Sequence, residues 1–74
     1  MTRYRDLSGN SGVVAYRIGT DHIAVEFRSG DMYLYTYHKP GKVAVEDMKR
    51  LAEAGRGLST YISQHVRDDY EARI

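Results

Sequence analysis

The chain contains 74 residues, with 11 lysines and arginines, 10 acidic residues and no cysteine. This length fits one small domain, and the lack of cysteine excludes disulfides and thiolate metal sites and favours a reducing, cytoplasmic location. The nearly balanced charge differs from the positive excess of most nucleic-acid-binding modules, and no apolar run reaches the length of a membrane span.

The first twelve residues are mostly charged or small and end in Ser-Gly-Asn-Ser-Gly. We therefore expect residues 1–12 to form a flexible N-terminal arm and residues 13–74 to form a single domain. The β-branched and aromatic stretch 13–18 (VVAYRI) predicts a first strand. Residues 22–27 (HIAVEF) alternate between apolar and other side chains, which predicts a second strand.

The third predicted strand carries a tyrosine at every second position, and its register decides whether these tyrosines face the core. A three-residue loop that ends in a bulge at Gly30 would place Val25 opposite Tyr33 and Ile23 opposite Tyr35, so that the tyrosines join the core. A two-residue loop would turn the tyrosines outwards as a binding platform. The glycine at the third loop position favours the first arrangement.

The second half of the sequence changes to helical periodicity. Pro40 and Gly41 end the third strand. A first helix is predicted from about Val43 to Ala54, because apolar residues recur on one side of it: Ala44, Met48, Leu51 and Ala52.

After the Gly-Arg-Gly sequence at 55–57, a narrow apolar stripe predicts a second helix, with Ser59 as its N-cap: Leu58, Ile62, Val66 and Tyr70. The expected fold is α+β, a three-stranded antiparallel meander followed by two helices packed on one face.

Several of these residues form a pattern known from a protein family. The pattern consists of Phe27-x-x-Gly30-x-x-Tyr33-x-Tyr35, the Pro40 turn, a helix and the ending Val66-Arg67-Asp68-Asp69-Tyr70. Over residues 13–70 the chain resembles the KTSC domain, whose signature is Tyr-x-Tyr. Many relatives carry Ala-x-Ser-x-Gly before the last helix, whereas this chain reads Ala-Glu-Ala-Gly-Arg-Gly at 52–57.

The resemblance implies a fold but no established activity. The family occurs at the C-terminus of some lysyl-tRNA synthetases and as stand-alone small bacterial or phage proteins. The resemblance therefore implies a location in the cytoplasm of a bacterium or of a phage-infected host cell.

Catalytic and metal-binding motifs are missing from the sequence. His22, His38 and His65 have no spacing typical of a metal site, and no serine lies in a nucleophile-elbow motif. We expect no enzymatic activity, no metal and no cofactor.

Four basic residues are predicted to converge at one end of the domain and to form a patch for phosphates or an acidic partner: Lys39, Lys42, Arg56 and Arg67. The acidic run at 68–71 lies beside Arg67, so ordinary solvated charge is the competing interpretation.

Two helices cannot cover both sides of a small sheet, so one sheet face should stay partly apolar and uncovered. The residues expected there are Val13, Ala15, Ala24, Met32 and Leu34. Exposed apolar patches usually mark an interaction site, which predicts a protein partner or self-association as a homodimer.

The first functional interpretation is therefore a small non-enzymatic protein-binding module, for example a phage or mobile-element inhibitor or adaptor of a bacterial defence complex. The alternative is an RNA- or DNA-binding accessory domain of the type appended to lysyl-tRNA synthetase. Nucleic-acid binding by a chain with so little net positive charge is expected to be weak.

Overall fold

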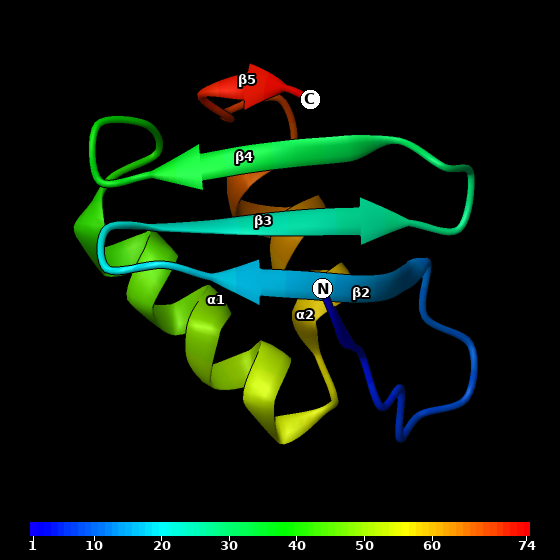
Figure 1. Cartoon of the computed structure of the whole chain (residues 1–74). Helices are drawn as coiled ribbons and strands as arrows, with labels where there is room; N and C mark the ends of the chain where they lie inside the picture. Colours follow the sequence, from blue (N-terminus) through cyan, green and yellow to red (C-terminus); the bar gives the residue numbers. More distant parts are fainter.

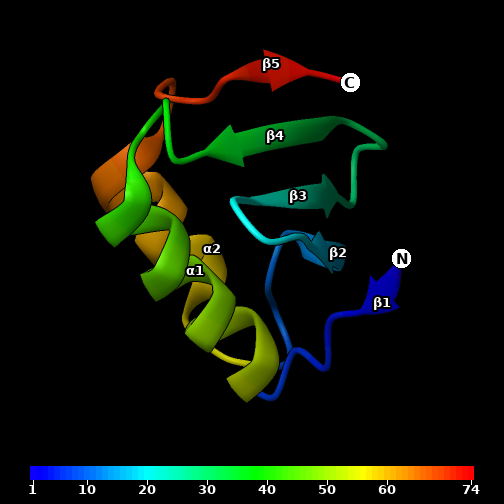
Figure 2. The same cartoon turned by 60° about the vertical axis from the view of Figure 1, so that its left-hand side comes forward.

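A five-stranded antiparallel sheet in the order β1-β2-β3-β4-β5 forms one layer of the computed structural model, which describes residues 1–74 (Figure 1). The strands are β1 Thr2–Arg3, β2 Val13–Ile18, β3 His22–Phe27, β4 Met32–Thr36 and β5 Ala72–Arg73. The helical layer comprises α1 Lys42–Ala54, α2 Leu58–Tyr61 and a π-helical turn η1 Ile62–Val66. Figure 2 shows the helices on one side of the sheet. None of the helices has the length and apolar character that crossing a membrane requires.

The α+β class and the antiparallel sheet agree with the sequence prediction, but the expected number of strands was wrong. Two short strands, β1 and β5, flank the predicted three and pair antiparallel with β2 and β4. Each contains only two residues. The sheet is therefore wider than a three-stranded meander, and both chain termini contribute to it.

The N-terminal segment is part of the domain, which corrects the expected boundary at residue 13. Tyr4 is only 3% exposed and belongs to the hydrophobic core. The Tyr4 hydroxyl accepts a hydrogen bond from the backbone N–H of Leu58 at 3.3 Å. The backbone N–H of Leu7 donates to the carbonyl of Gly55 at 2.7 Å. Residues 1–12 are thus tied to both layers.

The β3–β4 hairpin has the register expected from a bulge at Gly30. Val25 lies opposite Tyr33, and Ile23 lies opposite Tyr35. Gly30 has a φ angle of +96°, and its N–H donates to the carbonyl of Phe27 at 2.9 Å. A positive φ angle is easily adopted only by glycine. The prediction that Tyr33 and Tyr35 point towards the helices is confirmed.

The start of β2 differs from the predicted alternation. The pairing of β2 with β3 shifts between Val13 and Ala15, as in a β-bulge, and Val13 lies opposite Phe27 on the helix side of the sheet. An extra residue in one strand turns the side chains that precede it to the opposite face of the sheet. Val13 is 1% exposed and belongs to the core, so its predicted place on the uncovered face was wrong.

The first helix agrees with the prediction to within a residue at its start. Its buried face consists of Val45, Met48 and Ala52. Gly55 ends the helix in the left-handed conformation with a φ angle of +78°.

The second helical segment differs from the prediction in three ways. Gly57, and not Ser59, precedes its first residue, and its second half is a π-helical turn. It ends at Val66, so Tyr70 lies in the connection to β5 and not on the helix. The expected stripe still holds inside the helix, because Leu58, Ile62 and Val66 are all at most 6% exposed.

Candidate protein-binding face

The uncovered side of the sheet is the main candidate site. Figure 2 shows that no helix lies on this side. The register assigns residues to it strand by strand, because side chains alternate between the two faces. We call the set the open face: Arg3 on β1; Ala15 and Arg17 on β2; His22, Ala24 and Glu26 on β3; Met32, Leu34 and Thr36 on β4; Ala72 on β5, followed by Ile74.

The apolar part of the open face lies over β4 and β5. Met32, Leu34 and Ala72 are half-buried, and Ile74 is 58% exposed. The backbone N–H of Ile74 donates to the carbonyl of Met32 at 2.9 Å, which holds these two residues on neighbouring strands. Ala72 and Ile74 were not identified from the sequence, because a two-residue strand has no periodicity that could reveal it.

Two of the five predicted open-face residues are not available for contact. Val13 belongs to the core, as described above. Ala24 does lie on the open face, but it is fully buried, since the longer side chains of Arg17 and Leu34 stand directly across from it on the neighbouring strands. Ala15, Met32 and Leu34 remain partly exposed.

Three charged residues of the open face have no ionic partner within the domain. Arg3 and Arg17 are exposed and Glu26 is half-buried, and none of them forms a salt bridge. By contrast, Lys49 and Arg73 elsewhere on the surface are paired with Glu46 at 2.8 Å and with Asp31 at 2.7 Å. The open face therefore offers an apolar side over β4 and β5 and an unpaired basic side over β1 and β2.

The four basic residues predicted to form one patch do not converge. Lys39 and Lys42 lie at the start of α1, but Arg56 follows its end. A helix of 13 residues is about 20 Å long at 1.5 Å per residue. Arg67 follows the end of η1, near the start of α1, but Asp69 shares a groove there with Lys42 and His65. The predicted phosphate patch thus loses Arg56 and includes nearby negative charge.

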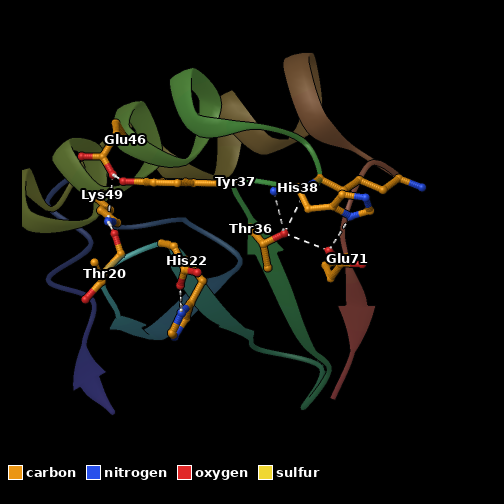
Figure 3. A network of polar contacts seen from close by, with 10 residues as sticks. Thr20, His22, Thr36, Tyr37, His38, Glu46, Lys49 and Glu71 are labelled. Atoms are coloured by element: carbon orange, nitrogen blue, oxygen red, sulfur yellow. Dashed lines mark hydrogen bonds and ion pairs between the residues drawn. The ribbon is translucent and has the colours of Figure 1, made fainter.

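A polar network joins the end of the sheet to α1 (Figure 3). The Tyr37 hydroxyl donates to the Glu46 carboxylate at 2.7 Å, and the Lys49 ammonium lies 2.8 Å from the same oxygen. Lys49 also donates to the carbonyl of Thr20 at 3.1 Å. The pKa of Glu46 is held below its ordinary value by Lys49 first and by Tyr37 second. These contacts fasten the β2–β3 turn to the helix, which is a structural role.

A second polar cluster connects β4 to the segment before β5. Glu71 accepts a hydrogen bond from the Thr36 hydroxyl at 2.9 Å and lies 2.9 Å from Nδ1 of His38 (Figure 3). The contact with His38, and to a smaller extent that with Thr36, keeps the pKa of Glu71 below its ordinary value. The cluster fastens the end of β4 to the start of β5.

The signature tyrosines have structural positions. Tyr35 is 1% exposed, and its ring packs against Tyr70 with 6.4 Å between centroids. Tyr33 is half-buried between Phe27 and Tyr70. Burial, together with Tyr33 and Tyr70 nearby, raises the pKa of Tyr35 to about 12. The platform interpretation of the stripe is therefore wrong for Tyr33 and Tyr35.

The histidines are dispersed over the domain. His22 lies 3.1 Å from Asp21, His38 contacts Glu71, and His65 stacks on Tyr61. No group of three or more histidine, aspartate or glutamate side chains is placed to hold a metal ion.

Comparison with known proteins adds no relative: no family model matches the chain, and neither a curated protein nor a solved structure is significantly similar to it. The resemblance to the KTSC domain is therefore carried by the quoted residues alone.

Proposed function

We propose that this chain is a small non-enzymatic binding module that acts through protein–protein interaction at its open face. One observation carries the proposal: Met32, Leu34, Ala72 and Ile74 form an apolar strip on a sheet face that no helix of the domain covers. Contiguous exposed apolar surface is unusual on a solitary domain and usually marks an interaction site.

The sheet edges are less suited to binding than the face. Both edge strands contain only two residues, and short edge strands offer few free backbone groups to an added strand. The partner therefore contacts side chains of the open face and not the backbone of an edge.

An inhibitor or adaptor that docks on a larger protein would have this form, and a phage or mobile-element protein that blocks a bacterial defence complex is one example of that class. The alternative, an accessory domain for RNA or DNA, loses support because Arg56 lies apart from Lys39 and Lys42 and because the tyrosine pair is occupied within the domain.

The substitution Leu34→Lys tests the proposal. Leu34 is half-buried near the middle of the strip, and a lysine there can extend its ammonium into water, so the fold should persist. Immobilised wild type should retain a specific protein from extracts of the native cells, and Leu34→Lys should retain at most about a tenth as much, since an interface centre tolerates charge poorly.

Val43→Lys is the matched control. Val43 is 77% exposed on α1, in the other layer, and receives the same change from an apolar side chain to lysine. Equal retention by wild type, Leu34→Lys and Val43→Lys, with unchanged circular dichroism, would show that binding occurs elsewhere.

A further inference from the structure

We propose that the occupant of the open face is an amphipathic helix of a partner protein, with carboxylates along one flank. This inference rests on the proposed function and specifies the chemistry of the partner.

The arrangement divides the open face into two sides. Met32, Leu34, Ala72 and Ile74 lie over β4 and β5, whereas Arg3 and Arg17 lie over β1 and β2. Between them, β3 presents Ala24, which is small and fully buried, flanked along the strand by the half-buried His22 and Glu26. Because strands are spaced by about 4.8 Å, the β2 and β4 side chains stand roughly 10 Å apart. This is about the diameter of an α-helix, so a helix along β3 can contact both sides at once.

The unpaired arginines of the open face indicate that one flank of the helix is acidic. Arg3 is paired with Ala15, and Arg17 lies two residues further on, so the two arginines are diagonal neighbours. Such neighbours lie about 7–8 Å apart. Neither has a carboxylate partner in the domain, whereas Lys49, Arg50 and Arg73 do. A helix that places glutamates over β2 would neutralise both.

The size of the face disfavours a second copy of the chain. The five strands are separated by four spacings of about 4.8 Å, and a strand of five residues at about 3.3 Å each is about 16 Å long, which gives a flat footprint on the order of 300 Å². A stable dimer buries about 800 Å² on each partner. In a face-to-face pair, a two-fold axis along the strands would place the apolar strip of one copy over the arginines of the other, and an axis across the strands would place arginines over arginines. An amphipathic helix matches the width of the face, and its apolar and acidic sides match the apolar and basic sides of the face.

A titration with two helical peptides tests the inference. Each peptide has 20 residues in an alanine-rich, helix-forming host with leucines at i, i+3, i+4 and i+7; one carries glutamates along one flank and the other carries lysines. We expect the glutamate peptide to bind the ¹⁵N-labelled full chain at least about fivefold more tightly than the lysine peptide, since glutamates attract the two exposed arginines and lysines repel them. The amide signals of Met32, Leu34 and Ala72 should shift.

Charge-neutralising variants supply the controls. Arg17→Gln should weaken binding of the glutamate peptide a few-fold, and Glu26→Gln should strengthen it, because Glu26 is the one carboxylate on the face. Arg56→Gln removes a basic residue at the far end of α1 and should leave binding unchanged.

Three outcomes would overturn the inference. These are equal binding of the two peptides, no binding of either at millimolar concentration, and sedimentation that shows a dimer below about 100 µM whose association Leu34→Lys abolishes. The last outcome would leave the proposed protein-binding role of the open face intact and would replace the helix by a second copy. Peptide-induced shifts confined to α1 or η1 would instead contradict the proposed function itself.

Discussion

Tyr35→Ala should unfold the domain or lower its melting temperature by about 12–40 °C, because truncation of a buried aromatic side chain to alanine costs about 3–5 kcal/mol and 1 kcal/mol corresponds to about 4–8 °C in a domain of this size. Tyr35 is 1% exposed and is the largest of the fully buried side chains. Its ring contacts Tyr70, so the loss would also loosen the connection to β5. Thermal denaturation followed by circular dichroism measures the effect.

Tyr35→Phe is the control for that experiment. The Tyr35 hydroxyl forms no side-chain hydrogen bond within the domain although the residue is 1% exposed, so removing the hydroxyl removes no such bond. The phenylalanine variant keeps the ring and should melt within a few degrees of the wild type. A melting temperature that hardly changes in Tyr35→Ala would place the ring in solvent.

A lysine at position 13 should have the second largest effect. Val13 is 1% exposed in the core, and an unpaired buried charge costs several kcal/mol. A domain of 74 residues has a free energy of unfolding of only about 4–11 kcal/mol. Val13→Lys should therefore be largely unfolded in urea concentrations that the wild type tolerates, as measured by a urea titration.

Ala15→Lys is the matched comparison, because Ala15 lies two positions further along the same strand but on the open face. A strand without a bulge would put residues 13 and 15 on the same face and make the two variants similar. The bulge between them predicts that Ala15→Lys folds and Val13→Lys does not. The reverse order of stabilities would show that Val13 faces outwards.

This bulge illustrates what sequence periodicity cannot resolve. Val13 and Val14 are both apolar, so the pattern VVAYRI allows either residue to face the core. The hairpin at Gly30 was predictable because one glycine position selects one loop and one register. The clear alternation of HIAVEF then determined which face of β3 and β4 meets the helices.

The sequence did not predict β1 and β5 for a different physical reason. Thr2–Arg3 and Ala72–Arg73 are too short to show a period of two, and each forms only because a neighbouring strand offers free backbone groups. The same holds for Tyr4, whose burial depends on a contact with Leu58 that is 54 residues away. Contacts between residues far apart in the sequence decide which segment pairs with the edge of the sheet. The local pattern of apolar residues does not reveal such contacts.

The residues of the candidate site were likewise predictable where they depend on the hairpin register and unpredictable where they depend on the short terminal strands. Met32 and Leu34 could be assigned to the open face from the hairpin register, and the structure places them there. Ala72, Ile74 and the unpaired Arg3 joined the face only through β1 and β5. The predicted basic patch failed because its members were assigned to loops whose position depends on how α1 is oriented.

The central claim is that the open face is the binding surface. Methyl NMR of the full chain, mixed with the protein that the immobilised wild type retains from cell extracts, tests this claim most directly. Upon addition of the partner, the methyl signals of Met32, Leu34, Ala72 and Ile74 should shift or broaden, while the methyl signals of Val43 on α1 should stay unchanged. Large changes at Val43 with none at Leu34 would contradict the account and would move the interface to the helical layer.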